Sequence, residues 1–81
     1  MKLLTTAYIV QSRLLFAKIL VTDNIANNFI ATLVYIDTGL VQAQHFASDK
    51  KGEVIATALA WLQDNIDRDA RIPNSTLASG N

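Results

Sequence analysis

The chain lacks several residue types on which protein chemistry depends. It contains no cysteine and only one histidine among 81 residues. Without cysteine there are no disulfides, thiolate nucleophiles or cysteine-based zinc sites. A single histidine also excludes a histidine pair within one chain, and no Ser, Asp or Glu stands at a recognisable partner spacing from His45. The sequence therefore predicts no catalytic residue, no metal site and no cofactor site, and it favours a protein that is not an enzyme.

Net charge is also missing, because Lys plus Arg and Asp plus Glu number seven each. No overall field therefore draws the chain to nucleic acid or to an acidic membrane surface. The apolar run near the N-terminus is interrupted at residues 11–13, too early for a membrane span and in the wrong pattern for a signal peptide. We expect a cytoplasmic protein without a membrane partner.

Hydrophobic residues, by contrast, make up 51% of the chain and charged residues only 17%. A chain of this size forms one domain, which buries only about 60–65% of its unfolded surface. We expect a single domain over residues 1–72. Small polar residues without periodicity follow Pro73, which predicts a disordered tail over residues 73–81.

Four segments have the β-branched, aromatic and alternating character of strands. They span residues 2–10, 13–22, 29–37 and 40–47. The asparagines of residues 23–28 favour a loop, and Thr38-Gly39 favours a tight hairpin turn in which Gly39 takes a positive φ. The fourth strand carries Gln42 and Gln44 on one face, which predicts an edge position.

The segment Ser48–Asp67 has apolar residues at helical spacing. Ser48 or Asp49 can cap its start, and Pro73 predicts an end between Ile66 and Arg71. The expected fold class is α+β, a four-stranded antiparallel meander with one long C-terminal helix packed on one face. One alternative stays open: the apolar residues of 3–22 also recur at helical spacing, so that segment can form one long helix in place of two strands.

The predicted sheet is wider than the helix that packs on it. Four strands span about 19 Å, whereas a helix is about 10 Å across. One helix therefore leaves apolar side chains of the other face open to water, and monomers rarely tolerate a large apolar patch without a use for it. Lys50-Lys51 at the helix start opposes the helix dipole, which hints at an acidic partner. The candidate protein-contact residues are Leu14, Phe16, Lys18, Leu20, Lys50 and Lys51.

Two motifs have a chemical as well as a structural interpretation. Asp37-Thr38-Gly39 matches the tripeptide of aspartic proteases, in which two carboxylates share one proton. A protease would need two copies of this short chain, and Leu40 replaces the small residue expected after the glycine, so a hairpin turn is the favoured interpretation. Asp64, Asp67 and Asp69 cluster near the helix end, where we expect a solvated face, with Asp64 and Asp67 on one side of the helix.

The order of strands and helix resembles two groups of proteins. The stretch YIDTGLVQAQHFASDKKGEVIATAL is similar in outline to the integrase arm-binding domains, which read DNA with three strands and a helix. A weak nucleic-acid-binding module is therefore the alternative function. Phosphate contacts need basic residues, however, and residues 28–47 contain no Lys or Arg.

The layout over residues 1–67, with TGLVQAQHFASDKKGEVIATALAWL as its nearest stretch, resembles small phage-encoded anti-CRISPR inhibitor proteins. That resemblance implies a non-enzymatic inhibitor that grips its target with a sheet. The favoured function is accordingly a small protein-interaction module, an inhibitor or adaptor that acts through its sheet surface or an edge strand. The expected partner is another protein or a second copy of the chain in a homodimer, and no small-molecule substrate is predicted.

Overall fold

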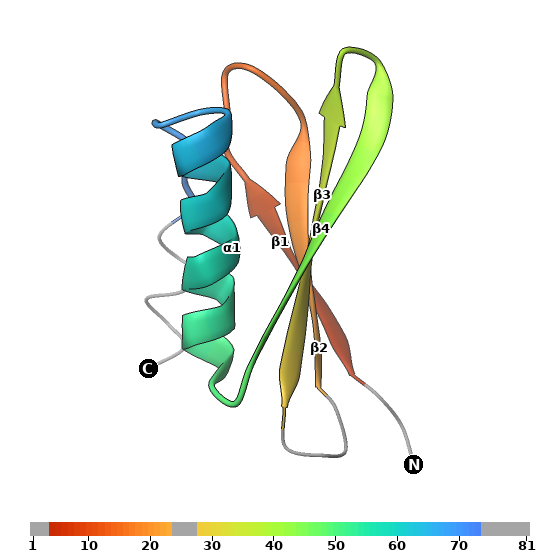
Figure 1. The fold of residues 1–81 in the computed structure, drawn as a ribbon, viewed down its shortest axis with the longest axis vertical. Coiled ribbons are helices and arrows are strands. Elements are labelled where there is room, and N and C mark those ends of the chain that lie inside the picture. Colours follow the sequence, from red (N-terminus) through yellow and green to blue (C-terminus); the bar gives the residue numbers. More distant parts are fainter. Residues whose placement is uncertain (1–3, 24–27, 74–81) are drawn as a thin grey trace.

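A computed structural model describes residues 4–23 and 28–73. It contains one antiparallel sheet in the order β1-β2-β3-β4 and a single helix on one face of that sheet (Figure 1). The elements are β1 Thr5–Val10, β2 Ala17–Asp23, β3 Phe29–Asp37, β4 Leu40–Ser48 and α1 Lys51–Asn65. The predicted α+β class, the meander order and the edge position of the fourth strand are confirmed.

The alternative of one long helix before residue 23 is wrong, because β1 and β2 pair in continuous register from Thr5↔Thr22 to Val10↔Ala17. The second strand begins at Ala17 and not at Arg13. Ser12 Oγ accepts hydrogen bonds from the N–H groups of Leu14 and Leu15 at 3.1 and 3.4 Å. These bonds hold residues 12–15, just before β2, in a loop.

The hairpin between β3 and β4 has the turn that the sequence predicts. Thr38 and Gly39 both have positive φ angles, of 51° and 83°. Two such residues form the turn whose twist matches that of paired strands. The register runs without interruption from Asp37↔Leu40 to Phe29↔Ser48. A loop is predicted over residues 23–28. Asp23 belongs instead to β2, and residues 24–27 lie outside the described residues.

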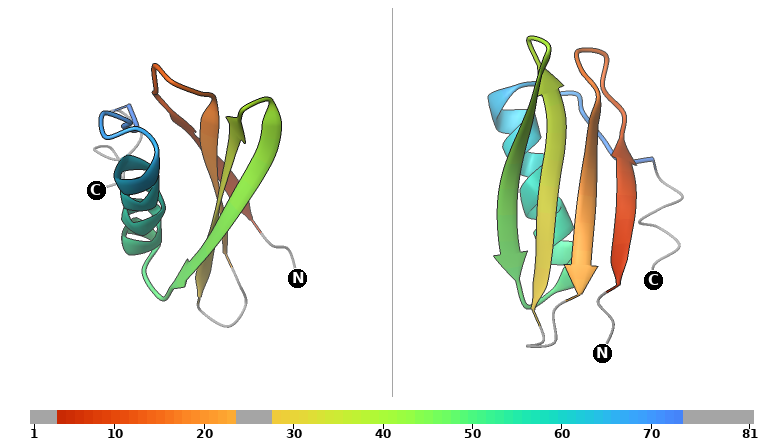
Figure 2. Two further views of the ribbon diagram at one scale, coloured as in Figure 1. Left: turned by 45° about the horizontal axis from the view of Figure 1, so that its top comes forward. Right: turned by 90° about the vertical axis from the view of Figure 1, so that its right-hand side faces the viewer.

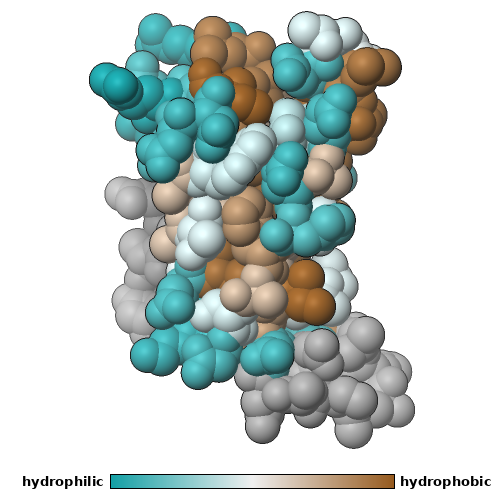
Figure 3. All heavy atoms as spheres, viewed as in Figure 1, coloured by the Kyte–Doolittle hydropathy of each residue, from teal (hydrophilic) through white to brown (hydrophobic). Residues whose placement is uncertain are grey.

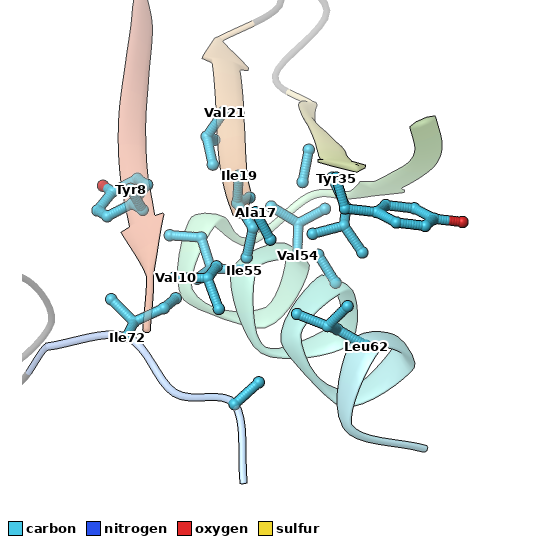
Figure 4. Close-up of a cluster of buried hydrophobic side chains, with 14 residues drawn as sticks. Tyr8, Val10, Ala17, Ile19, Val21, Tyr35, Val54, Ile55, Leu62 and Ile72 are labelled. Carbon is cyan, nitrogen blue, oxygen red and sulfur yellow. The ribbon is translucent and has the colours of Figure 1, made fainter. Parts of the chain in front are cut away.

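The core lies between the sheet and α1, where side chains from both layers point toward one another (Figure 4). Ile19, Leu33 and Leu62 are its largest fully buried members, with Val21 and Val54 beside them. The partly buried Trp61 and Phe46 pack against it, and the Trp61 and Tyr35 ring centroids are 5.7 Å apart. The helical apolar stripe therefore does bury against the sheet.

The helix is shorter than predicted at both ends. Ser48 still pairs with Phe29 in the sheet, so the N-cap is Lys50, which has no side-chain cap. Ser48 Oγ instead accepts the Lys50 N–H at 3.2 Å and donates to Glu53 Oε1 at 3.1 Å. At the other end, Ile66 leaves the helical conformation with φ −132°, well before Pro73. Pro73 is therefore not the residue that ends α1.

The segment after α1 completes the cover that the helix alone does not provide. Helix α1 packs over β2, β3 and β4. The chain then turns back toward β1 (Figure 2). There the Gln11 N–H donates to the Arg71 carbonyl at 2.7 Å, and the Arg71 N–H donates to the Gln11 carbonyl at 3.1 Å. Ala70 and Ile72 of this segment are buried. The predicted tail lies outside the described residues from 74 onward. The opposite face of the sheet carries no second layer among the described residues (Figure 2).

Candidate protein-interaction surface

The face of the sheet turned away from α1, here called the open face, is built from cross-strand rows of side chains. In register across the four strands, Ile9 lies beside Lys18, Lys18 beside Val34, and Val34 beside Ala43. The next row toward the hairpin turn contains Phe16, Ile36 and Val41, since Ile36 N–H donates to the Phe16 carbonyl at 3.0 Å and Ile36 pairs with Val41. Alternation along each strand thus puts these side chains on one surface.

One end of the open face is apolar and exposed. Phe16, Val41 and Ile9 are 81%, 70% and 62% exposed, and Ile36 is 42% exposed. We call this group, with the half-buried Val34 and the exposed Lys18, the open-face patch: Ile9, Phe16, Lys18, Val34, Ile36 and Val41. Figure 3 shows hydrophobic atoms gathered at the upper right, where Figure 1 draws the β3–β4 hairpin.

A shallow hollow of about 360 Å³ lies over this patch. All six patch residues line it, together with Val10, Ala17 and Tyr35. Lys18 is the only charged residue in the lining. The hollow can therefore take an apolar side chain from a partner, with a single cation at hand for an acidic group.

The opposite end of the open face mixes polar and apolar side chains. Thr5 and Thr22 hydroxyls lie 3.1 Å apart, and Thr32 Oγ1 lies 3.1 Å from His45 Nδ1. Each pair spans two neighbouring strands, so these polar groups satisfy one another across the sheet. Ile30 lies between Thr22 and Ala47 in this part of the face and is 36% exposed, so the most exposed apolar side chains, but not all of them, lie near the hairpin turn.

The structure does not bring all the predicted contact residues together. Phe16 and Lys18 belong to the patch, while Leu20 lies half-buried in the neighbouring row between Ala7 and Thr32. Leu14 is 66% exposed in the loop before β2. Lys50 and Lys51 lie at the far end of β4, where α1 begins. Their contact roles remain predictions.

Sequence reasoning missed Ile9, Ile36 and Val41. The signal was present, because each stands at an alternate position from a core-facing neighbour: Ile9 follows Tyr8, and Ile36 follows Tyr35. What the sequence did not supply was the register that aligns them with Phe16.

A buried carboxylate anchors the loop that presents Phe16. Asp67 is only 6% exposed, and its Oδ2 accepts a hydrogen bond of 2.6 Å from Ser12 Oγ. Its Oδ1 accepts the Asp69 N–H at 3.0 Å. Ser12 in turn accepts the N–H groups of the loop, so the contact ties the segment before β2 to the segment after α1. This arrangement fixes the backbone that leads into the patch.

These hydrogen bonds lower the pKa of Asp67 below its ordinary value of 3.8. The Ser12 hydroxyl contributes most, followed by the Asp69 N–H. Burial acts in the opposite direction, and the Arg13 N–H and charge add smaller lowering effects. The carboxyl group is therefore ionised at neutral pH, because its charged form accepts the bonds.

The structure shows where the Asp37-Thr38-Gly39 motif and the cluster of aspartates near the helix end lie. Asp37 is exposed at the end of β3, and Thr38-Gly39 forms the predicted hairpin turn. Asp67 lies beyond the end of α1 and is buried, so it does not share a solvated helix face with Asp64. Among residues 4–23 and 28–73, no three acidic or histidine side chains gather as a metal site would require.

A second and larger cleft, of about 620 Å³, lies beside this anchor. Arg13 and Arg71 line it together with Asp67 and Asp69, so charges of both signs face the same space. Because two acidic and two basic residues line it, the cleft has no clear preference for an anion or a cation.

Comparison of the chain with protein-family models, with curated proteins and with solved structures found no match. In the part of the chain that the structure describes, no helix combines the length and the apolar character needed to cross a membrane. The functional argument therefore rests on the surface itself.

Proposed function

We propose that this chain is a small protein-interaction module that binds a protein partner through the open-face patch, without performing chemistry on it. The observation that carries the proposal is the exposure of Phe16, 81%, in a row with Ile36 and Val41 on a sheet face that has no second layer among the described residues. Large apolar side chains grouped in this way mark interaction sites on soluble proteins.

The patch offers enough burial to support binding. Full burial of a large apolar side chain contributes about 1.5–3 kcal/mol, so covering Phe16, Val41 and Ile9 would contribute on the order of 1–2 kcal/mol each. The whole open face, about 19 Å by about 30 Å along its two longest strands, is smaller than the roughly 800 Å² that one partner buries in a standard interface, so binding depends on a few well-buried side chains. Phe16 is the natural anchor, since aromatic residues dominate such interfaces.

The chemistry of the patch describes its partner. Five of its six residues are apolar, and Lys18 supplies the one positive charge. The matching surface is an apolar ridge with an acidic group placed to meet Lys18. The resemblance to small phage-encoded inhibitors supports an inhibitory role for such a contact, and an adaptor role uses the same surface.

Nucleic-acid binding is the weaker candidate, and the charge of the open face argues against it. Phosphate recognition needs several Lys or Arg side chains. Among the described residues of β1 to β4, Lys18 is the only one of either type. The apolar row beside it would gain little from a phosphate backbone.

Affinity capture with matched variants tests the proposal. The wild-type chain, Phe16→Asp and Leu4→Asp are immobilised and exposed to one lysate of the source cells, and the captured proteins are quantified by mass spectrometry. Leu4 is the control because it is also a large apolar residue, 64% exposed, outside the patch. Both substitutions add the same charge at an exposed position.

We expect at least one protein to be captured by the wild type and by Leu4→Asp, and to be reduced at least tenfold with Phe16→Asp. In titration calorimetry the purified partner should then bind the wild type and Leu4→Asp with similar affinity, and Phe16→Asp more weakly. Equal capture by all three chains, or loss with Leu4→Asp alone, would show that the patch is not the binding surface.

A further inference from the structure

The open face presents side chains but no free backbone groups over its two central strands. Strands β2 and β3 are paired on both sides, so their N–H and C=O groups bond within the sheet (Figure 2). A chain segment that lies on this face therefore finds no backbone partner there. An extended segment would lose water from its own backbone groups without replacing it, whereas a helix arrives with its backbone hydrogen bonds already made. The face therefore favours a helix as its occupant.

The open-face patch also has the dimensions of a short helix. It reaches from Ile9 on β1 to Val41 on β4, about 14 Å across the strands, and its two rows lie about 7 Å apart. A helix is about 10 Å across, and about two to three turns of it span the patch. A second sheet would also cover the far end of the open face, where the exposed Thr5 and His45 would lose contact with water.

The charge of the open face argues against a second copy of the chain as the matching surface. No Asp or Glu stands at an open-face position among the described strand residues, because Asp23 and Asp37 occupy alternate positions that belong to the α1 side. Packing two open faces together would therefore bury Lys18 of each copy without a carboxylate. The α1 helix of a second copy fits no better, since its exposed positions, such as Ala56 and Ala60, carry no large apolar side chain.

From these features we infer that the partner of the open-face patch is a different protein that presents an amphipathic helix to it. The helix carries apolar side chains at positions i, i+3 or i+4, and i+7, and an Asp or Glu at the border of that stripe. An apolar side chain of the helix enters the hollow of about 360 Å³ beside Phe16. The acidic residue pairs with Lys18, the only charged residue that lines the hollow. The inference rests on the proposed function and identifies the structural class of its partner.

Selection from two peptide display libraries tests the inference. Peptides of the first library are about four turns of helix long, with apolar residues at i, i+3, i+4 and i+7 and randomised residues at the borders of the stripe. Peptides of the second library have the same composition with apolar residues at alternate positions, which favours an extended conformation. Both libraries are selected on the wild-type chain, and enriched peptides are titrated against wild type, Phe16→Asp and Leu4→Asp by fluorescence anisotropy.

We expect enrichment from the helical library alone, with Asp or Glu at a border position. The enriched peptides should bind wild type and Leu4→Asp alike, and Phe16→Asp at least tenfold more weakly. Proline at a central position that faces away from the apolar stripe should abolish binding, whereas alanine at that position should not. Selection on Lys18→Glu should replace the acidic residue by Lys or Arg, and an unchanged acidic preference would contradict the pairing with Lys18.

Absence of any Phe16-dependent peptide from the helical library would overturn the inference. If such peptides came from the alternating library, or if lysate capture still depended on Phe16, the proposed function would stand and only the helix would be excluded. Sedimentation equilibrium in the micromolar range tests a second copy as the occupant, and we expect the 8.9 kDa mass of one chain. A rise toward twice that mass that is lost with Phe16→Asp would assign the open face to self-association instead.

Discussion

At the scale of single residues, Asp67 shows how one side chain joins two parts of the chain that are far apart in sequence. Its carboxylate receives the Ser12 hydroxyl from the loop before β2 and the Asp69 N–H from the segment after α1. The Gln11–Arg71 backbone contact lies in the same region and closes the sheet edge there. The loop that leads to Phe16 therefore depends on the charge state of a residue that does not itself lie in the patch.

Replacing this carboxylate should make stability depend on pH in a defined way. The folded-state pKa of Asp67 is lower than its ordinary value of 3.8, so the charged form stabilises the fold. That contribution is present above about pH 3.8 and is lost as the pH falls through the lower folded-state pKa. We expect Asp67→Asn to lower the unfolding temperature at pH 7 and to differ progressively less from wild type below pH 3.8.

The measurement is thermal unfolding followed by circular dichroism from pH 2 to pH 7. Asp64→Asn is the matched control, because Asp64 is exposed near the end of α1 and lies outside the network that Ser12 and Asp69 form with Asp67. It should not lower the unfolding temperature at pH 7. A constant difference between Asp67→Asn and wild type across the whole pH range would argue against the role of the charge.

At the scale of elements, the hairpin β3–β4 depends on its two-residue turn. Gly39 has a φ of 83°, and a Cβ built there would meet no atom within 4 Å, so only the backbone conformation opposes a side chain. We expect Gly39→Ala to reduce the free energy of unfolding by about 1–2 kcal/mol. Gly52→Ala is the control: space is also open there, and the residue lies in α1, so alanine should stabilise by up to about 1 kcal/mol.

Urea titration of both variants measures these changes. Opposite signs for two identical substitutions would show that the turn conformation, and not the added methyl group, determines the effect. Destabilisation by both variants would contradict this account.

The elements also show how far sequence reasoning reached. Alternation and turn residues located β3 and β4 almost to the residue, because both signals are local. The start of β2 was placed too early, because the Leu14 and Leu15 N–H groups bond to Ser12 Oγ and hold a loop before Ala17. The start of α1 was also placed too early, because Ser48 still pairs with Phe29, a contact between residues distant in sequence. The patch was predicted only in part for the same reason: Phe16 was recognisable, but its alignment with Ile36 and Val41 comes from strand register.

At the scale of the whole molecule, the helix covers one face of the sheet, so the surface that forms the core differs from the surface proposed for association. Helix α1 and the segment after it bury one face, and that segment pairs with Gln11 directly after β1, which provides the core that so small a chain needs. The open face takes no part in that core. Substitutions on this surface should therefore change association without unfolding the protein, which is what makes the variants proposed above informative.

The chemistry of the open face leads to a prediction about salt. Its apolar rows carry one formal charge among the described residues, Lys18, so binding driven by the patch should depend weakly on ionic strength. We expect the partner's dissociation constant to change less than about threefold between 50 and 200 mM salt. A protein that contacts six or more phosphates would lose about a thousandfold or more over that range.

Titration calorimetry of the captured partner at both salt concentrations makes this comparison, with Lys18→Gln as the matched variant. That substitution should remove most of the remaining salt dependence while retaining most of the affinity, because the apolar contacts at Phe16 and its neighbours persist. A steep loss of affinity with salt that Lys18→Gln does not reduce would mean that charges outside the open face govern binding. In that case the nucleic-acid alternative would be favoured over the patch.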